Sequence, residues 1–488
     1  MTSCSKKDNP GNIQANAIAI DSTGITSGTP VGSAATGADA DDLVENSSFP
    51  SLVTMAFGAT ASISNPLSGS GGVSIVQTGS DIVITSTATG VEYQLSGTTT
   101  NGSVKIYSAK KFELNLNNVS ITSTSGPAIN IQSSKTAFVV VADGTANTLI
   151  DPATYATSTE DQKGTFFSEG QLVFSGNGNL SVTGNNKHGI CSDDYIRVRS
   201  GNITVTSAVK DGMHTNDYFI VDGGNIKITA SDDGIECESG YVIVNAGTLT
   251  LNAVSHGITA SYADGDKTII PYVTINGGTI NANISGGEGI QSKNVLTINN
   301  GNISATSTDD GMNADTAIYI NNGSVYLNSS ANDGMESNGI ITITGGKTVA
   351  IGAQATKKGI NCGANTFKIT GGLVLGTGGE TSEPTANVST VNSVIMGAGT
   401  ANKIIHFETA SGTEALTFLS PTAYSTLLFA CSKLKSATTY NVYTGGSVSS
   451  KSTNFNGLYT SGGYSKGTKG ASFTTSTVVT QAGGTLSN

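Results

Sequence analysis

The sequence predicts an all-β solenoid in which each coil holds three short strands and about 22–23 residues. Two observations predict it: a glycine followed by Ile or Met recurs at nearly constant spacing, and the residues between the copies alternate apolar and polar. The eight glycines are Gly189, Gly212, Gly234, Gly257, Gly289, Gly311, Gly334 and Gly359, with steps of 23, 22, 23, 32, 22, 23 and 25 residues. So regular a period indicates one supersecondary unit stacked on itself.

A single repeat shows where the strands lie. The unit that starts at Asp211 reads DGMHTNDYFIVDGGNIKITAS. Its short alternating runs are separated by Gly, Asn and Asp, which predicts strands joined by turns, and no run has the 3.6-residue spacing of a helix. A propeller blade needs about 40 residues or more. The unit is therefore predicted to be one coil of a parallel β-helix.

Equivalent residues of successive coils form columns about 4.8 Å apart. The column after each glycine is always Ile or Met, so it is predicted to point into the core, where its burial stabilises the solenoid. Two residues later comes a column of small residues, which includes Cys237 and Cys362 and fits a narrow corner. The inward column consists of Ile190, Met213, Ile235, Ile258, Ile290, Met312, Met335 and Ile360.

Three regions follow from the pattern. Residues 1–45 are rich in Gly, Ala, Ser, Thr and Asp and are predicted to be a flexible tether. Residues 46–384 carry the coils. Residues 385–488 lose the period and are predicted to form antiparallel strands that cap the open end of the solenoid.

The start of the chain offers two interpretations. It reads MTSCSKKDNPGN and has no apolar stretch, so as written it contains neither a signal peptide nor a membrane span. A cysteine before Ser, Lys and Asp resembles the mature start of a bacterial lipoprotein, in which Cys4 would be lipidated at the cell surface. The alternative is an ordinary cytosolic start.

The net charge of −11 disfavours nucleic acid and anionic membranes as partners. Cations, neutral sugars and acidic ligands bridged by a cation remain. Any contact with a membrane is expected only through the lipid anchor.

Carboxylates gather beside the repeated glycines, where a row of like charges needs neutralisation. Calcium, which binds six to eight oxygens, is the predicted neutraliser. The alternative is that each Asp caps its own turn. Three histidines, His188, His214 and His256, share these columns, but their spread over four coils disfavours a single zinc site. The predicted calcium ligands are Asp193, Asp194, Asp211, Asp217, Asp233 and Glu236 in one group, and Asp309, Asp310, Asp315 and Asp333 in another.

A tyrosine column is the second candidate site. Tyr195, Tyr218, Tyr241 and Tyr272 occupy one outward position in four coils. Stacked rings offer flat faces to sugars, and the only two arginines, Arg197 and Arg199, could bind a sugar carboxylate beside them. His188 and His214 complete the predicted carbohydrate-binding set. The alternative is a ladder that only shields a turn.

Several stretches, among them FELNLNNVSIT, GQLVFSGNGNLSVTGNNKHGICSDDYIRVRSGNITVT and KDGMHTNDYFIVDGG, resemble the carbohydrate-binding domain-containing family of bacterial surface proteins. The resemblance implies a right-handed, pectate-lyase-like parallel β-helix. It also implies calcium binding and affinity for plant cell-wall polysaccharides such as cellulose and polygalacturonate.

These observations favour a non-catalytic, calcium-dependent polysaccharide-binding protein of the bacterial surface. One alternative is a calcium-dependent polysaccharide lyase, with Asp193, Asp211 and Asp217 holding the ion near a base at Arg197 or Lys210. Another is a structural fibre or adhesin subunit that assembles end to end rather than a monomer, in which IQANAIAIDS adds as a strand to a neighbour.

Overall fold

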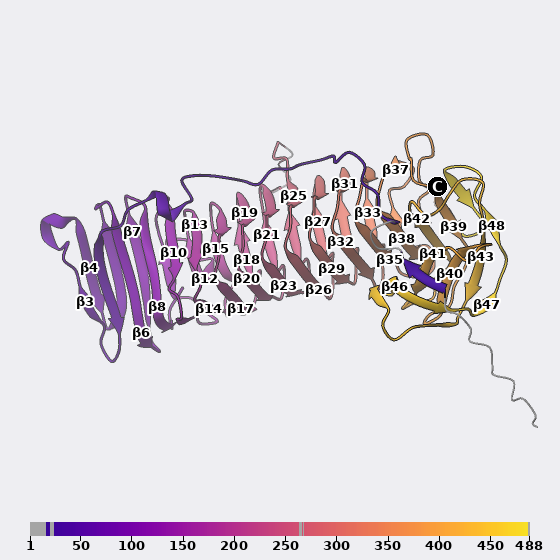
Figure 1. Ribbon diagram of the computed structural model, residues 1–488. Helices are drawn as coiled ribbons and strands as arrows, with labels where there is room; N and C mark the ends of the chain where they lie inside the picture. Colours follow the sequence, from indigo (N-terminus) through magenta and orange to yellow (C-terminus); the bar gives the residue numbers. More distant parts are fainter. Residues whose placement is uncertain (1–15, 20–23, 263–265, 267, 487–488) are drawn as a thin grey trace, which may run out of the picture.

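The computed structural model describes residues 16–19, 24–262, 266 and 268–486. It is an elongated parallel β-solenoid of about 13 turns with three sheets, and a β-rich C-terminal domain lies at one end (Figure 1). Two single-turn 3-10 helices, η1 (Val44–Asn46) and η2 (Gly69–Gly71), flank the first strands. Within the described ranges, no helix has both the length and the apolar character needed to cross a membrane.

Sheet 1 contains 13 strands, all parallel except the antiparallel end pair β4–β5. From β9 onward its strands are five residues or shorter, and most have three. Its members are β4 (Val73–Thr78), β5 (Ser80–Ser86), β7 (Gly102–Ser108), β9 (Ile129–Ile131), β12 (Gly164–Ser168), β15 (His188–Ser192), β18 (Met213–Thr215), β21 (Ile235–Cys237), β24 (Ile258–Ala260), β27 (Ile290–Ser292), β30 (Met312–Ala314), β33 (Met335–Ser337) and β36 (Ile360–Asn361).

Sheets 2 and 3 are both parallel stacks and share the long strands β6 and β8. At the N-terminal end of the solenoid, β3 pairs antiparallel with β2. Sheet 2 contains β3 (Ser62–Ser64), β2 (Ser51–Phe57), β6 (Val91–Thr99), β8 (Phe112–Thr122), β10 (Ala137–Val141), β13 (Leu172–Gly176), β16 (Ile196–Val198), β19 (Tyr218–Val221), β22 (Tyr241–Val244), β25 (Tyr272–Ile275), β28 (Val295–Ile298), β31 (Ala317–Ile320), β34 (Ile340–Ile343) and β37 (Phe367–Ile369). Sheet 3 continues from β8 with β11 (Ala146–Ile150), β14 (Asn179–Gly184), β17 (Asn202–Ala208), β20 (Asn225–Thr229), β23 (Thr248–Ala253), β26 (Thr279–Ile284), β29 (Asn302–Ser307), β32 (Ser324–Ser329), β35 (Lys347–Ile351) and β38 (Leu373–Gly378).

The register of sheet 1 confirms the predicted core column. Ile190 pairs with Met213, Met213 with Ile235, and the pairing continues coil by coil to Ile360. These side chains are fully buried, and Cys237 and Cys362 are buried beside them as predicted. The core is one continuous apolar cluster along the solenoid.

The repeated glycines occupy a corner where successive coils approach too closely for a side chain. A Cβ added at Gly257 would lie 2.4 Å from the carbonyl oxygen of Gly289, and one added at Gly289 would lie 2.4 Å from that of Gly311. These glycine carbonyls also accept hydrogen bonds from the neighbouring coil. For example, the backbone N–H of Ile258 donates to the carbonyl oxygen of Gly289 at 3.3 Å. The glycine in the repeat is therefore a packing requirement of the corner.

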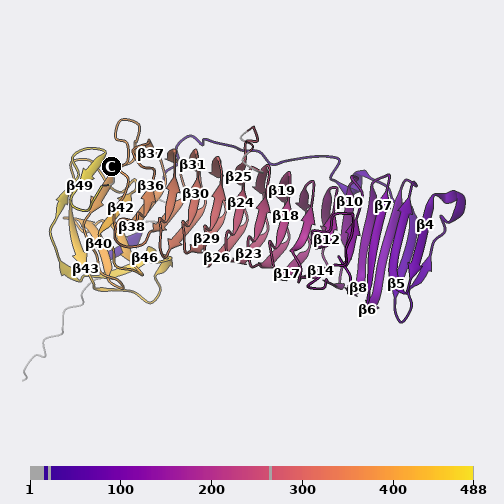
Figure 2. The same cartoon turned by 180° about the vertical axis from the view of Figure 1, so that it is seen from behind.

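Residues 24–50, here called the strap, lie along the outside of sheet 2 from the C-terminal domain toward the far end of the solenoid (Figures 1 and 2). A ladder of asparagines holds it. Each side-chain amide nitrogen donates to a strap carbonyl at 2.7 to 2.9 Å. It also donates at 2.8 Å to the Oδ1 atom of the equivalent residue in the preceding coil, which is Asp222 for the first asparagine and an asparagine for the others. The ladder residues are Asn245, Asn276, Asn299 and Asn321.

This docking corrects the prediction of a flexible tether for residues 24–45. The composition of the strap is that of a linker, but its main-chain carbonyls are bound by side chains from distant coils. The rest of the predicted tether, apart from residues 16–19, lies outside the described residues, and so does Cys4.

The C-terminal domain is built on an antiparallel sheet that β1 (Asn16–Ala19) joins by pairing with β46. Residues 16–19 of the segment expected to add to a neighbour thus pair within their own chain. Strands β42, β39 and β49 are not part of this sheet: β42 pairs antiparallel with β38 of the last coil and with β39, and β39 pairs with β49, so the three extend the sheets of the solenoid. The remaining strands are β39 (Ser393–Met396), β40 (Ile404–Thr409), β41 (Glu414–Leu419), β42 (Thr426–Ala430), β43 (Thr439–Thr444), β44 (Ser447–Val448), β45 (Thr453–Phe455), β46 (Leu458–Ser465), β47 (Thr468–Lys469), β48 (Phe473–Thr474) and β49 (Val479–Gln481).

A buried polar network lies beneath β1. His406 is fully buried; its Nδ1 lies 2.8 Å from Thr417 Oγ1 and its Nε2 lies 3.4 Å from Glu408 Oε2. Glu408 also accepts hydrogen bonds from Asn16 of β1 and from Lys466. Burial lowers the pKa of His406 to about 4.

We predict that Gly289→Ala lowers the thermal unfolding midpoint, because the added methyl group would overlap the Gly311 carbonyl and the Ala305 side chain. Overpacking of this kind costs about 1–3 kcal/mol. Gly58→Ala is the matched control, since its Cβ would meet nothing closer than 3.5 Å. Circular dichroism melts of the two variants should differ clearly; equal midpoints would contradict the packing explanation.

We predict that the C-terminal domain loses stability as the pH falls from 6.5 toward 4. The folded state keeps His406 neutral down to a pKa of about 4, whereas the unfolded chain binds a proton near 6.5. The unfolded state therefore holds more protons in this window, and the loss reaches about 3 kcal/mol. Denaturant unfolding followed by tyrosine near-UV dichroism should show this loss, and His406→Gln should reduce it; a pH-independent midpoint would contradict it.

Candidate functional site

A row of polar side chains runs along sheet 1 where its strands begin. We call it the acidic row. It combines the residue before each repeated glycine with the outward residue at the centre of each strand, and most of its members are buried or half-buried. Its members are His188, Asp211, His214, Asp233, Glu236, His256, Glu288, Gln291, Asp310, Asn313, Asp333, Glu336, Lys358 and Asn361.

Each aspartate of the row accepts a backbone N–H of the next coil through its Oδ1 atom. Asp211 Oδ1 accepts the backbone N–H of Asp233 at 3.0 Å, and Asp310 Oδ1 accepts that of Asp333 at 2.9 Å. This is the turn-capping role, but it spans two coils. In both residues Oδ2 is left to contact other members of the row.

The first group centres on Asp211. His188 Nδ1 and His214 Nδ1 each lie 3.0 Å from Asp211 Oδ2, and His214 Nδ1 lies 3.1 Å from Glu236 Oε2. The two imidazole rings stack at 4.3 Å. Burial works against the charge of Asp211, but hydrogen bonds from both histidines lower its pKa, whereas burial raises the pKa of Glu236 to about 7.

The second group repeats the first four coils later. Asn313 Nδ2 donates to Asp310 Oδ2 at 2.9 Å and to Glu336 Oε2 at 3.3 Å. Asn361 Nδ2 donates to Asp333 Oδ2 at 2.6 Å and to Glu336 Oε1 at 2.7 Å. Burial and the neighbouring Glu336 raise the pKa of Asp310 to about 9. The carboxylates are thus crowded enough that a proton or a cation is needed between them.

A third set joins the two groups. His256 Nδ1 lies 2.8 Å from Asp233 Oδ1, and its Nε2 lies 3.1 Å from Glu288 Oε2. Burial alone would lower the pKa of His256, but these two carboxylates raise it to about 10. Gln291 donates to Glu288 at 2.7 Å and extends the row.

The structure separates five of the predicted calcium ligands from the row. Asp193, Asp194, Asp217 and Asp315 follow their strands and lie at the opposite edge of sheet 1, because a strand of three to five residues stands between the two positions. Asp193 forms an ion pair with Lys163 at 2.7 Å. Asp194 accepts from Gln171 and Asp315 from Asn338. Asp309 precedes the row and accepts from Asn332. The predicted groups therefore shrink to Asp211, Asp233 and Glu236, and to Asp310 and Asp333.

Sequence reasoning left three members out of the second group: Asn313, Glu336 and Asn361. The signal was present, because Glu336 occupies the same column as Glu236. Asn313 likewise occupies the column of His214.

The predicted tyrosine column forms a stack. Tyr195, Tyr218, Tyr241 and Tyr272 have ring centroids 4.2, 4.9 and 4.7 Å apart and lie nearly parallel. Tyr195 is buried and donates to Asp42 of the strap. The other three rings are half-buried at the surface, so their edges remain accessible.

Both arginines bind the strap. Arg197 is 5% exposed and contacts Asp42 Oδ2 at 3.2 Å, Asp222 Oδ2 at 2.7 Å and the Gly37 carbonyl at 2.7 Å. Arg199 pairs with Glu45 at 2.8 Å. The guanidinium groups expected to bind a sugar carboxylate are thus already paired with carboxylates of the chain itself, on sheet 2 rather than beside the acidic row.

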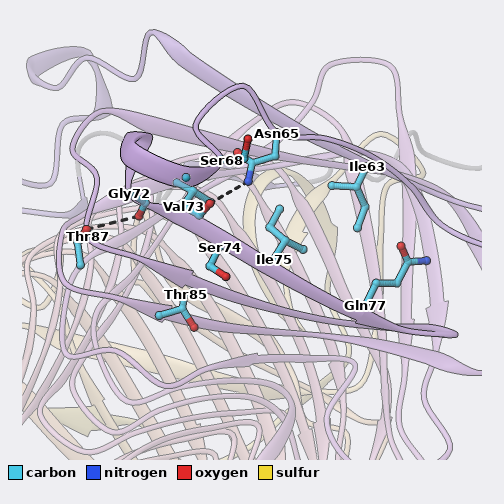
Figure 3. A pocket seen from close by; sticks show the side chains of 11 residues that line it. Ile63, Asn65, Ser68, Gly72, Val73, Ser74, Ile75, Gln77, Thr85 and Thr87 are labelled. Carbon is cyan, nitrogen blue, oxygen red and sulfur yellow. Dashed lines mark hydrogen bonds between the residues drawn. The ribbon is translucent and has the colours of Figure 1, made fainter.

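An open groove lies at the N-terminal end, away from both sites (Figure 3). Strands β3 and β4 form its walls, and Ile63, Asn65, Ile75 and Gln77 are among the residues that line it. Its volume is about 760 Å³. None of the predicted site residues contributes to it.

Comparison with known proteins identifies relatives. Residues 78–334 and 273–416 match the family described as carbohydrate-binding domain-containing protein, which covers more than half of the chain. A carbohydrate-binding domain-containing protein of Acetivibrio thermocellus is 33% identical over 111 residues, which are 22% of this chain and 39% of that protein. A solved polysaccharide lyase-like protein from C. thermocellum, a gadolinium derivative, is 21% identical, with 60% of this chain and 96% of that chain covered. Its TM-score of 0.37 is too low to support a functional comparison.

We predict that Arg197→Ala exposes the strap to proteases, because it leaves Asp42 buried without its cationic partner. Arg199→Ala is the control, since its partner Glu45 is 65% exposed and such pairs contribute little. Limited proteolysis with mass spectrometry should locate faster cleavage within residues 24–50 of the first variant only. Equal cleavage of both variants would show that this ion pair does not hold the strap.

Proposed function

Because the chain belongs to the carbohydrate-binding domain-containing family, we propose that it binds a polysaccharide along the acidic row and does so with calcium, without cleaving the polymer. The row supports this proposal. It runs over eight coils and repeats at the coil spacing of about 4.8 Å, which suits an extended polymer.

The second group supports calcium. Asp310, Asp333 and Glu336 each offer a carboxylate oxygen, and these atoms lie within 4.8 Å of one another. A rotation of the Asn313 amide would turn its oxygen toward these carboxylates, whereas the Asn361 amide oxygen already accepts hydrogen bonds from Lys358 Nζ and the Gly363 N–H. Such an all-oxygen set is what calcium prefers, and the ion would replace the proton that the crowded carboxylates otherwise need. A calcium ion bound here would bridge to acidic sugars, which an acidic surface cannot attract alone.

The lyase alternative depends on Lys210, because the other predicted base, Arg197, does not lie near the row. Arg197 lies on sheet 2 and is paired with two carboxylates. Lys210, beside Asp211, faces Asp232 at 3.5 Å and is 57% exposed. A lyase base must reach the sugar C5 proton next to the ion, and only Lys210 of the two predicted bases lies near the row.

The cell surface is the proposed location, with lipidation at Cys4. Mass spectrometry of the N-terminal peptide from the native membrane fraction would test it, and an unmodified cysteine would contradict it.

We predict that binding to polygalacturonate requires calcium and is lost with chelator. Glu336→Gln removes one carboxylate charge from the second group and should weaken calcium binding about tenfold or more. Isothermal titration with calcium, followed by affinity electrophoresis in polygalacturonate and in soluble cellulose derivatives, measures both effects.

Glu92→Gln is the matched control, because Glu92 is a half-buried strand carboxylate on sheet 2. It should bind calcium and polymer like the unchanged protein. Equal binding by Glu336→Gln, or binding that survives the chelator, would contradict the calcium proposal. Steady release of unsaturated uronates, followed by their absorbance, would replace simple binding with lyase activity.

A further inference from the structure

We propose that His188, Asp211, His214 and Glu236 form a binding site for a divalent transition-metal ion of the zinc class, distinct from the calcium group at Asp310. Its four residues belong to the acidic row, but its test uses no glycan, so the result does not depend on the proposed polysaccharide binding.

The sequence supplies the first argument, because the two groups are copies of one motif. The first reads DGMH at Asp211–His214 and DGIE at Asp233–Glu236. The second reads DGMN and DGME at the equivalent positions. The first copy has His214 where the second has an amide. In the preceding coil, the residue before the glycine is His188 in the first copy and Glu288 in the second. Two nitrogen donors thus replace two oxygen donors in the first copy.

The geometry brings these donors together. Asp211 Oδ2 lies 3.0 Å from the Nδ1 atoms of His188 and His214, and His214 Nδ1 lies 3.1 Å from Glu236 Oε2. Ligands bound about 2.1 Å from a tetrahedral ion are roughly 3.4 Å apart. Three of the six pairs among the four atoms are therefore within a few tenths of an ångström of this spacing, and Asp211, His214 and Glu236 each offer one atom within 4.8 Å of the other two. Two imidazoles and two carboxylates suit zinc, nickel or copper better than calcium, which requires six to eight oxygens.

The imidazole nitrogens of the group each face more than one partner. His188 Nδ1 lies 3.0 Å from Asp211 Oδ2 and 3.4 Å from the backbone nitrogen of Asp211. A single proton on His214 Nδ1 faces two carboxylates. A metal ion would satisfy all four atoms at once.

The far side of His214 has the surroundings of a metal-bound histidine. Its Nε2 atom lies 3.5 Å from Glu238 Oε2, and Glu238 belongs to no other part of the group. Histidines that bind metals through one nitrogen usually donate the other N–H to a carboxylate, which fixes the ring. This contact lies outside the group itself and has no counterpart at Asn313, which lacks a second ring nitrogen.

The ion can reach the site and would join three coils. The side chains of His188 and Glu236 are 14% and 26% exposed, whereas Asp211 is 2% exposed and lies at the base. The ligands come from β15, the β18 coil and β21, which are consecutive in sheet 1. Binding should therefore raise the thermal midpoint of the solenoid.

Cys191 lies behind the two imidazoles, and its sulfur is within 4.8 Å of a nitrogen of each. It is fully buried, and burial raises the pKa of its thiol to about 12. We assign it no bond to the metal.

Titration of the chelator-treated full-length protein with Co²⁺ tests the site, because cobalt reports its ligands through visible absorption. One equivalent should bind with a saturable band, and excess Ca²⁺ should not remove it. His214→Asn copies the second group and should weaken Co²⁺ binding about tenfold or more. The reciprocal Asn313→His should add a second saturable equivalent.

Two controls keep the outcome clear. Calorimetric melts without metal establish that each variant folds, and Zn²⁺ should raise the midpoint of the unchanged protein but not that of His214→Asn. Cys191→Ser should leave the band unchanged, and loss of the band would overturn the assigned ligands. No band at stoichiometric Co²⁺, or equal binding by His214→Asn, would overturn the site itself.

Discussion

Close contact between coils at the glycine corner is the constraint on which the rest of the molecule depends. Each repeated glycine leaves no room for a Cβ beneath the carbonyl of the next, so the coils stack without slipping there. This fixes the register of sheet 1, because a one-residue slip would turn Ile190 and its column outward. The same register aligns every side chain next to the corner into a column.

The alignment of columns brings polar residues from different repeats into contact. Residues more than 20 positions apart, such as Asp211 and Asp233, become neighbours joined by a backbone hydrogen bond. Since each aspartate uses one oxygen to bind the next coil, the corner places the other oxygens along one line. The first group has His214 at the position where the second group has Asn313, so the two groups differ in their donor atoms although their fold is the same.

The columns could be predicted because equivalent residues recur at a fixed spacing in the sequence. The structure confirms three of them: the inward column of Ile and Met, the column of small residues that includes Cys237, and the stack from Tyr195 to Tyr272. The period alone does not show that residues before and after a short strand lie too far apart to share one ion. Asp193 was therefore grouped with Asp211, although Asp193 follows its strand and Asp211 precedes the next one. The strap was missed for another reason. Asn245 and its equivalents bind main-chain carbonyls, which any residue possesses, so the strap sequence carries no signal of its partner.

The docking of β1 has a mechanical consequence. Asn16 and the last described residues both lie in the C-terminal domain, since β1 pairs with β46 and β49 pairs with β39. Tension applied between these two points passes across the hydrogen bonds of the β1–β46 pair and bypasses every coil. The solenoid thus bears no load until β1 detaches, and only then does force begin to peel the strap from its asparagines.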